Sequence, residues 1–486
     1  MTAARVTGHE PPSVRLLQDY RWWAFCLIIV CLKLFLFGID PNPKLFMGDS
    51  GSYLWTALSG WIPPDRSFLY GFVIRWVSLT THSLNSLLLL QAFLAANTAI
   101  LLVLICRQFF LLSARLAYTA GFVCAIDPLQ LIWERYVIAE TISLFFYAAM
   151  LVFCFSYLRN RRLWQLALVQ IFALLAITFR ISYLPIVDAT TVALPFAAFV
   201  PLLWAGPATD SRVRVARSLV VHLAFSILLM LGLHLGYKKV NGLLSDRPPA
   251  YLYSSGLSIL AVWAPALQPS DSPDPRLAQI ISQGKQFHLT NLRLRNSQLY
   301  SKGYLVDRWQ NAEGDSALAD QVAKHTALQA LFRRPTAIAS LGWRTFLGYF
   351  DPHQLHQQAK ADLGRGDWPK PMTQTMESRL RLAPPARGEA KSHSPLQRYF
   401  LAAQPYYYLV VLSPFICAIL FLFVRQTYVL LLFLHGCIFL ATDSLLAVTA
   451  SVRYLQPLSF LTILVFAVFA NYLIQQPSFA RSSMPL

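Results

Sequence analysis

Acidic and basic side chains stand beside the ends of long apolar blocks in this chain. Asp49 follows the first block, Arg180 ends a later one, and Arg453 precedes the last. An aspartate can act as a general base that takes a proton from an attacking hydroxyl. The guanidinium group of arginine matches phosphate oxygens in shape and keeps its charge. The complete set is Asp49, Asp65, Arg66, Asp127, Glu134, Arg135, Glu140, Arg180, Arg453 and Tyr454. Ionisable groups at membrane depth usually mark a site or an ion pair, and their convergence predicts a pocket for an anionic substrate.

Each of these residues also has a purely structural interpretation. Asp49 lies between Gly and Ser residues that suit a turn or a helix N-cap. The arginines can extend to the membrane interface or pair with Glu134 or Glu140. Lys33, inside the first apolar block, is interpreted as a residue that extends to the interface. The gathering of carboxylates and arginines at one face is what favours a functional site.

Composition indicates whether these residues belong to a membrane protein or to a water-soluble one. Of 486 residues, 56% are hydrophobic and only 13% are charged. The apolar residues come in blocks of about 17–25, the length that spans a bilayer. The net charge of +18 sits largely in breaks between these blocks, as expected for membrane topology and contact with anionic lipids rather than nucleic acid. We therefore predict an integral membrane protein that binds membrane lipids and no nucleic acid.

The apolar blocks predict an all-α polytopic fold with about ten transmembrane helices. The predicted ranges are 22–39, 84–106, 116–133, 141–158, 163–179, 183–204, 218–236, 405–424, 427–447 and 455–475. Arginines concentrate in the short connections on one side, notably at 159–162, and this asymmetry places both termini in the cytoplasm. The candidate site then lies on the outer side.

Two stretches are too polar or too interrupted to cross a membrane, and they define the expected domains. Residues 1–236 form a transmembrane module whose first outer loop, 40–83, ends in an amphipathic helix lying in the interface. Residues 237–403 form a long, mainly helical outer region, and 404–486 hold the C-terminal transmembrane helices.

Four segments carry a resemblance to a known family. They are Gly48-Asp49-Ser50 with Tyr53, Ala57 and Arg66-Ser67-Phe68-Leu69-Tyr70; Asp127-Pro128 with Ala139-Glu140-Thr141; Thr178-Phe179-Arg180; and Ser451-Val452-Arg453-Tyr454-Leu455-Gln456-Pro457. In order, spacing and common outer location, this pattern resembles the GT-C superfamily of polyprenyl-phosphate-sugar-dependent glycosyltransferases. It is most similar to the branch with protein O-mannosyltransferases and the aminoarabinose transferase of lipid A. The resemblance leaves residues 237–403 unmatched.

The resemblance implies a GT-C-like bundle and an enzyme that moves a sugar from a polyprenyl phosphate to an acceptor hydroxyl with inversion. Asp49 would be the catalytic base. Substrate-binding roles would fall to Tyr53, Arg66, Tyr70, Glu140, Arg180, Arg453 and Tyr454. The acceptor would be a glycan, a lipid or a protein, and the expected location is a bacterial inner membrane with the site on the periplasmic side.

The sequence also bears on metal binding and on two alternative functions. Some members of the superfamily use a divalent cation, but the acids near Asp49 are sparse and His353 and His356 are loosely spaced, so no metal or other cofactor is predicted. One alternative is an O-antigen-type polymerase or ligase that relies on arginines and a histidine of the outer region. Another is a transporter with broken helices, for which Pro185, Pro195 and Pro201 in one helix are the hint.

Overall fold

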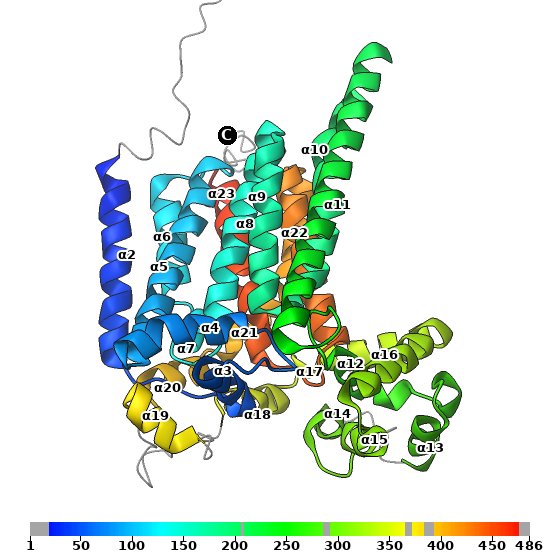
Figure 1. Ribbon diagram of the computed structural model, residues 1–486. Helices are drawn as coiled ribbons and strands as arrows, with labels where there is room; N and C mark the ends of the chain where they lie inside the picture. Colours follow the sequence, from blue (N-terminus) through cyan, green and yellow to red (C-terminus); the bar gives the residue numbers. More distant parts are fainter. Residues whose placement is uncertain (1–18, 206–208, 285–291, 365–371, 383–392, 476–486) are drawn as a thin grey trace, which may run out of the picture.

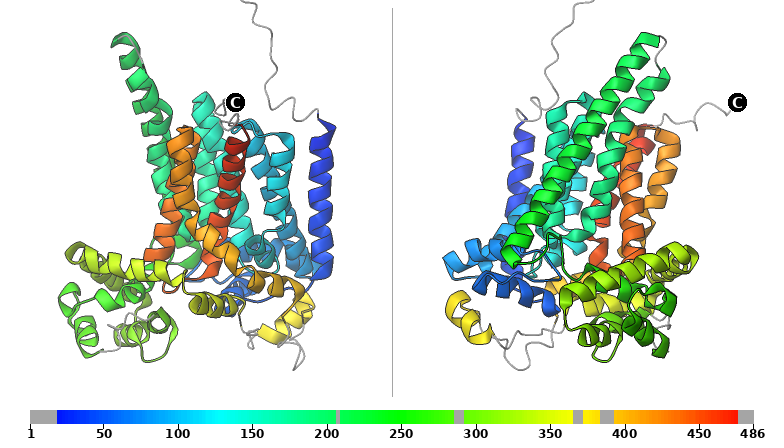
Figure 2. Two further views of the ribbon diagram at one scale, coloured as in Figure 1. Left: turned by 180° about the vertical axis from the view of Figure 1, so that it is seen from behind. Right: turned by 45° about the vertical axis from the view of Figure 1, so that its right-hand side comes forward.

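The computed structural model describes residues 19–205, 209–284, 292–364, 372–382 and 393–475. Within these ranges the chain is helical, and the β-structure is a single bridge between Lys44 and Tyr136. Figures 1 and 2 show long helices standing side by side in one layer, with shorter helices gathered at one end of that layer. We call this end the loop face.

The upright layer contains the apolar blocks of the sequence. Its helices are α2 (Tyr20–Ile39), α5 (Asn85–Gln108), α6 (Ala114–Ala125), α8 (Glu140–Asn160), α9 (Leu163–Phe179), α10 (Leu184–Ala205), α11 (Thr209–Ser245), α21 (Gln404–Val424), α22 (Thr427–Leu445) and α23 (Gln456–Gln475). Eight helices of the described chain have the length and hydropathy to cross a membrane. The shorter α6 and α9 stand beside them in the layer (Figure 1). The prediction of an all-α polytopic membrane protein is confirmed.

The helices differ in how much of their surface the protein covers. In α8, 78% of the membrane-crossing stretch is buried, whereas the corresponding values are 22% for α2 and 11% for α11. Apolar side chains on α2 and α11 are therefore solvated by lipid rather than by protein. The core of the layer lies around α8, and α2 and α11 stand at its edges (Figure 2).

The predicted helix 116–133 is two helices, α6 and α7 (Pro128–Trp133). The break falls at Asp127, whose carboxylate accepts a hydrogen bond from the Leu129 N–H at 2.8 Å. Asp at the N-cap and Pro at the first helical position together begin a new helix, because proline has no N–H to leave unpaired there. The Asp-Pro pair in the sequence was the signal for this boundary.

The loop face is built from short helices of two parts of the chain. They are α3 (Met47–Ser59), α4 (Leu69–Ile74) continued by a π-helical turn (Arg75–Leu79), α7, α12 (Ser255–Val262), α13 (Pro275–Gln283), α14 (Leu292–Tyr300), α15 (Leu305–Glu313), α16 (Ser316–Arg333), α17 (Pro335–Gly348), α18 (Pro352–Asp362), α19 (Thr373–Leu380) and α20 (Pro395–Ala402). Helices α3 and α4 pack so closely that a Cβ on Gly71 would lie 2.4 Å from Thr56. Helices α12–α16 bury their own apolar cluster, with Trp263, Leu277 and Trp309 among its members.

A buried ion pair joins α2 to the segment after α7. The Lys33 side chain is 1% exposed, and its ammonium group donates to a carboxylate oxygen of Glu134, which is fully buried. The sequence predicted that Lys33 extends to the interface, and this prediction was wrong. Its ammonium group stays inside the protein because it pairs with the buried Glu134 carboxylate. A charge removed from water persists only when it is paired and hydrogen-bonded.

This pair gives a prediction about stability. Lys33→Met leaves the Glu134 carboxylate buried without its counter-charge, which typically costs about 3–5 kcal/mol of folding free energy. We expect a marked fall in thermal unfolding temperature in detergent. The double variant Lys33→Met/Glu134→Leu removes both charges and should recover most of the loss. Equal unfolding temperatures for the native protein and Lys33→Met would show that the pair carries no stability.

Candidate functional site

The first outer loop is fastened to the segment between α7 and α8, and this contact sets the position of Asp49. The Lys44 N–H donates to the Arg135 carbonyl at 2.8 Å, and the Val137 N–H donates to the Lys44 carbonyl at 2.9 Å. The Ser50 hydroxyl donates to the Val137 carbonyl at 2.9 Å. The first turn of α3, which contains Asp49, is thereby held beside the start of α8.

Asp49 is bound by two arginines from distant parts of the sequence. One carboxylate oxygen lies 2.8 Å from Arg66 Nη1, and the other lies 2.8 Å from Arg453 Nη1. Arg453 also donates through Nε to Glu140, which is the first residue of α8 and is buried. The four residues therefore form one chain of charges that joins the first loop, α8 and the segment before α23.

The two guanidinium groups determine the protonation of Asp49. Burial by itself would raise the pKa of this carboxyl group, but the positive charges of Arg66 and Arg453 outweigh it and hold the pKa at about 2. The carboxylate is therefore ionised at every physiological pH. It is also a weak base for as long as both arginines stay bound to it.

Tyr53 packs against Arg66, and Tyr70 packs behind Tyr53. The Arg66 guanidinium lies 5.5 Å from the centre of the Tyr53 ring, and that ring meets Tyr70 edge to face at 4.7 Å. The Tyr70 hydroxyl donates to Gln91 at 2.6 Å and the residue is fully buried. Tyr53 can face a ligand, whereas Tyr70 supports it from behind. Arg66 is further paired with Asp65.

Arg180 and Tyr454 form a second part of the site. The Arg180 guanidinium lies 5.4 Å from the centre of the Tyr454 ring, a cation–π distance. Nη1 of Arg180 is buried and has no hydrogen-bond partner in the described chain. No ion pair of Arg180 is present among the described residues, unlike Arg66 and Arg453. Arg180 is thus the arginine of the site that keeps its charge available for an anion.

A cavity of about 2290 Å³ contains these groups. It lies between the ends of the spanning helices, including the start of α10 and the end of α22, and the outer helices α12, α14, α15 and α18. Predicted site residues on its lining are Asp49, Tyr53, Arg66, Arg180, Arg453 and Tyr454. Tyr70 and Glu140 lie behind this lining. Asp127, Glu134 and Arg135, which the sequence grouped with the site, are buried elsewhere in the fold.

Two lining carboxylates, Asp362 and Asp443, were not identified from the sequence. Asp362 ends α18 and accepts hydrogen bonds from the Ser451 hydroxyl at 3.0 Å and from the Arg453 N–H at 3.1 Å. Asp443 lies near the end of α22 and is 5% exposed. An acid inside an apolar block was the available signal for Asp443. For Asp362 the sequence offered none, because its partners are about ninety residues away in the chain.

Side chains of the outer region contact the connection between α22 and α23, which we call the Arg453 loop (445–453). Trp263 donates to the Leu445 carbonyl at 2.9 Å and Tyr349 donates to the Ser451 carbonyl at 3.2 Å. Arg295 is fully buried and donates to Thr345, to the Val262 carbonyl and to the Ala447 carbonyl at 2.8, 3.2 and 3.4 Å. The Arg453 loop is therefore positioned by helices of the outer region as well as by the spanning helices.

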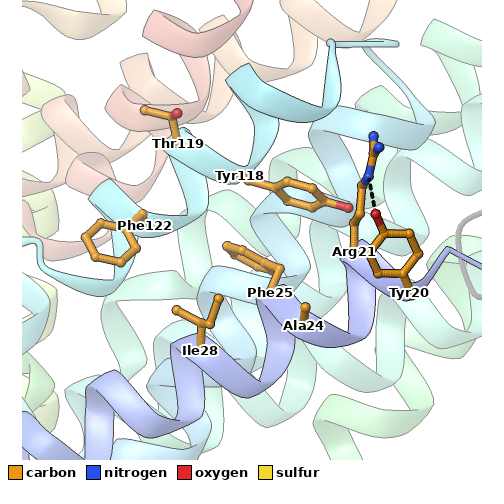
Figure 3. A pocket seen from close by; sticks show the side chains of 8 residues that line it. All are labelled: Tyr20, Arg21, Ala24, Phe25, Ile28, Tyr118, Thr119 and Phe122. Atoms are coloured by element: carbon orange, nitrogen blue, oxygen red, sulfur yellow. Dashed lines mark hydrogen bonds between the residues drawn. The ribbon is translucent and has the colours of Figure 1, made fainter.

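A second, smaller hollow has a different character. It measures about 530 Å³ and lies between α2 and α6, toward the end of α2 away from the loop face. Figure 3 shows Phe25, Ile28 and Phe122 along it, with Arg21 and Tyr20 at one end. This groove holds no carboxylate, and its apolar lining suits contact with lipid chains rather than chemistry.

Metal-binding side chains do not cluster in the described part of the chain. No three His, Cys, Asp or Glu residues there are placed to share an ion. His353 lies 2.6 Å from the Gln357 amide and His356 pairs with Gln404, and neither lines the cavity. The described residues therefore bring no such ligand set together.

Comparison with known proteins gives structural similarities only. No protein-family model and no curated protein sequence matches the chain. The archaeal oligosaccharyltransferase AglB from Archaeoglobus fulgidus, solved with an inhibitory peptide and a dolichol-phosphate, is similar at a TM-score of 0.44 and 13% identity; the match covers 93% of this chain and 50% of that one. The arabinosyltransferase EmbB from Mycobacterium smegmatis is similar at a TM-score of 0.34 and 12% identity, with 98% and 43% covered. This chain thus spans about half the length of these proteins or less, and its chemistry is assigned below from its own residues.

The low pKa of Asp49 predicts how its ion pairs respond to acid. A carboxyl group whose pKa falls from 3.8 to about 2 on folding stabilises the folded state above pH 4. That contribution, of order 2 kcal/mol, is lost as the pH falls from about 4 to about 2. We expect Asp49→Asn to unfold at a lower temperature than the native protein at pH 7, and the difference to shrink through this acid range. A difference that stays constant from pH 7 to pH 2 would contradict the assigned ion pairs.

The contacts of Arg295 predict a local change in the Arg453 loop. Arg295→Met keeps most of the side-chain volume but leaves three buried acceptors without a donor, so residues 445–453 should exchange their amide hydrogens at least about tenfold faster. Hydrogen exchange read by mass spectrometry measures this. Arg276→Met is the matched control, because Arg276 is half exposed and pairs with Asp274 and Glu313 away from the loop. Unchanged exchange in Arg295→Met would assign the loop position to other contacts.

Proposed function

We propose that this protein is a membrane glycosyltransferase that moves a sugar from a polyprenyl-phosphate donor to an acceptor hydroxyl, with inversion at the anomeric carbon. The observation that carries the proposal is the convergence of Arg66, Arg180 and Arg453 with Asp49 on one large cavity at the ends of the membrane-crossing helices. A lipid-linked anion reaches such a place from within the bilayer. Three guanidinium groups with one facing carboxylate fit a phosphate leaving group and a general base.

The arginines supply the electrostatic part of the chemistry. As the bond between the sugar and the phosphate oxygen breaks, the phosphate keeps the electron pair and gains one negative charge. Arg180 is the first receptor for this phosphate, because it has no carboxylate partner of its own among the described residues. Charges in a poorly hydrated cavity interact more strongly than in water, so the arginines stabilise the leaving group most when its charge is largest.

Asp49 becomes a useful base only when the donor is present. The phosphate competes with the carboxylate for Arg66 and Arg453, and each contact that Asp49 gives up raises its affinity for a proton. The freed carboxylate then takes the proton of the acceptor hydroxyl while that oxygen forms the new bond to the anomeric carbon. Donor binding and base activation are thereby coupled.

The two sides of the cavity come from different parts of the chain, and we assign them different roles. The transmembrane module 1–236 and the helices of 404–486 supply the residues around Asp49 and Arg180. The outer region 237–403 covers the other side with polar residues such as Asn296, Gln310 and Gln354. Amide side chains can donate and accept hydrogen bonds, so we assign acceptor recognition to this region. Whether a glycan, a lipid or a protein carries the hydroxyl is the next question for experiment.

Arginine placement supports an outer location for the site. The connection from α8 to α9 carries Arg159, Arg161 and Arg162, and it lies at the end of the layer away from the loop face. Short loops rich in arginine stay in the cytoplasm. The loop face is then on the outer side, where activated sugars arrive through the membrane on lipid carriers. A bacterial inner membrane, with the site facing the periplasm, fits this orientation.

The rival functions find less support in the described structure. Helix α10 continues through Pro195 and Pro201, so these prolines do not produce the broken helix of a transporter. The polymerase or ligase alternative relies on a histidine of the outer region, and His353 and His356 of that region do not line the cavity.

The proposal predicts transfer from a lipid-linked sugar that depends on Asp49. Purified protein in nanodiscs is given a panel of radiolabelled polyprenyl-phosphate sugars with cell extract as the source of acceptors. The native protein should transfer one of them, and Asp49→Asn should lower the rate at least about 100-fold, because a general base contributes roughly 10²–10⁴. The matched control is Asp246→Asn, since Asp246 is exposed and its φ of 53° is one that asparagine adopts readily.

Each outcome has a distinct meaning. No turnover of any donor by native protein of normal thermal stability would overturn the proposed function. Transfer at the native rate by Asp49→Asn would keep the glycosyltransferase and exclude Asp49 as its base. Loss in Asp49→Asn with normal retention of the radiolabelled donor assigns the residue to the chemical step.

A further inference from the structure

Asp443 is a buried acid without a partner. The side chain is 5% exposed, its Oδ2 atom has no hydrogen bond in the described chain, and it lines the cavity beside Thr442. The positive charge that acts on it comes from Arg180. Arg180 carries the complementary feature, a buried Nη1 without a partner. Two orphaned polar groups, an acid and a guanidinium group, therefore face the same cavity.

Other acids on the lining are already engaged. Both oxygens of Asp49 contact arginines, Asp65 is paired with Arg66, and Asp362 accepts from Ser451 and from the Arg453 backbone. A buried polar group that lacks a hydrogen bond costs about 1–3 kcal/mol, and a charged one costs more. Asp443 makes no contact within the described fold that offsets this cost. A ligand that donates a hydrogen bond to Asp443 offsets this cost.

We propose that Asp443 and Arg180 together recognise the head group of the donor: Arg180 binds the phosphate and Asp443 accepts a hydrogen bond from a sugar hydroxyl. This inference rests on the proposed function and adds to it the residue that selects the sugar. The hydroxyl is preferred to an amino group, because the positive charge of Arg180, which acts at Asp443, repels an ammonium ion placed beside it. The donor is accordingly a neutral sugar on an anionic lipid phosphate.

The position of the pair on the fold suits this role. Arg180 directly follows α9, and Asp443 lies near the end of α22. Tyr454, whose ring lies against the Arg180 guanidinium, is in the short helical turn (Val452–Leu455) that leads into α23. All three come from the ends of membrane-crossing helices rather than from the outer region. A head group held by them stays at the boundary of the membrane, within reach of its own lipid tail and of Asp49 on the same lining.

The test uses monodeoxy analogues of the donor that the native protein transfers. The native protein should disfavour one analogue at least about tenfold in kcat/KM, because a site built to bind a hydroxyl rejects a ligand that lacks it. Asp443→Leu removes the acceptor atoms at similar volume, and we expect it to transfer the donor and that analogue at rates within about twofold of each other. Asp443→Asn keeps one acceptor oxygen and should discriminate to an intermediate degree.

A measurement of stability separates this role from a structural one. Because Asp443 makes no bond within the described fold, Asp443→Leu should unfold at the native temperature or above it. Discrimination that is unchanged in a folded Asp443→Leu variant overturns the inference while leaving the glycosyltransferase intact. Transfer of no donor by the native protein overturns the proposed function itself. Tighter use of an amino-sugar donor by the native protein than by Asp443→Leu would replace the hydroxyl with an ammonium group.

Discussion

The organisation of the loop face depends on the carboxylate of Asp49, which bridges Arg66 and Arg453. The second of these contacts joins residues 404 positions apart and closes the first loop onto the start of the last helix. Glu140 extends the chain of charges to α8 at the centre of the bundle. In water such pairs contribute little, but half-buried charges of this kind leave a large penalty when one member is removed. In the proposed mechanism, the same contacts that assemble the site keep Asp49 a weak base until an anion competes for the arginines.

The outer region is part of the site rather than an appendage to it. Its own apolar cluster packs α12–α16 together, and from this body Trp263 and Arg295 reach the backbone of the Arg453 loop. Tyr349, at the end of α17, reaches the same loop from the main core. A guanidinium group positioned by backbone contacts on both sides loses little further entropy when it binds a phosphate. The cavity and the Arg453 loop thus share one set of supports.

Buried charges in this protein differ in whether they line the cavity. Lys33 pairs with one oxygen of Glu134, and Asp127 caps α7 and accepts from Ser459, so these contacts stabilise the fold away from the cavity. Arg180 and Asp443 are buried on the lining with atoms that nothing in the described chain satisfies. Arg135 and one oxygen of Glu134 also lack hydrogen-bond partners in the described chain, but they lie away from the cavity. An orphaned charged atom combined with a place on the cavity lining is what marks Arg180 and Asp443 as candidates for ligand binding.

Sequence alone determined that the protein lies in a membrane and where its long apolar helices run, because membrane-spanning length and hydropathy can be read within each block. The single helix expected at 116–133 was wrong, although the Asp-Pro pair is a local signal for its break. The residue types near Asp49 and Arg180 predicted a phosphate site, because charged residues stand out at the ends of apolar blocks. Tertiary structure decided which charges meet, since a side chain's partner can lie hundreds of residues away. In the folded protein Lys33 pairs with a buried carboxylate, and Asp443 and the outer region line the cavity. The distances between these residues depend on long-range packing, which no local sequence pattern encodes.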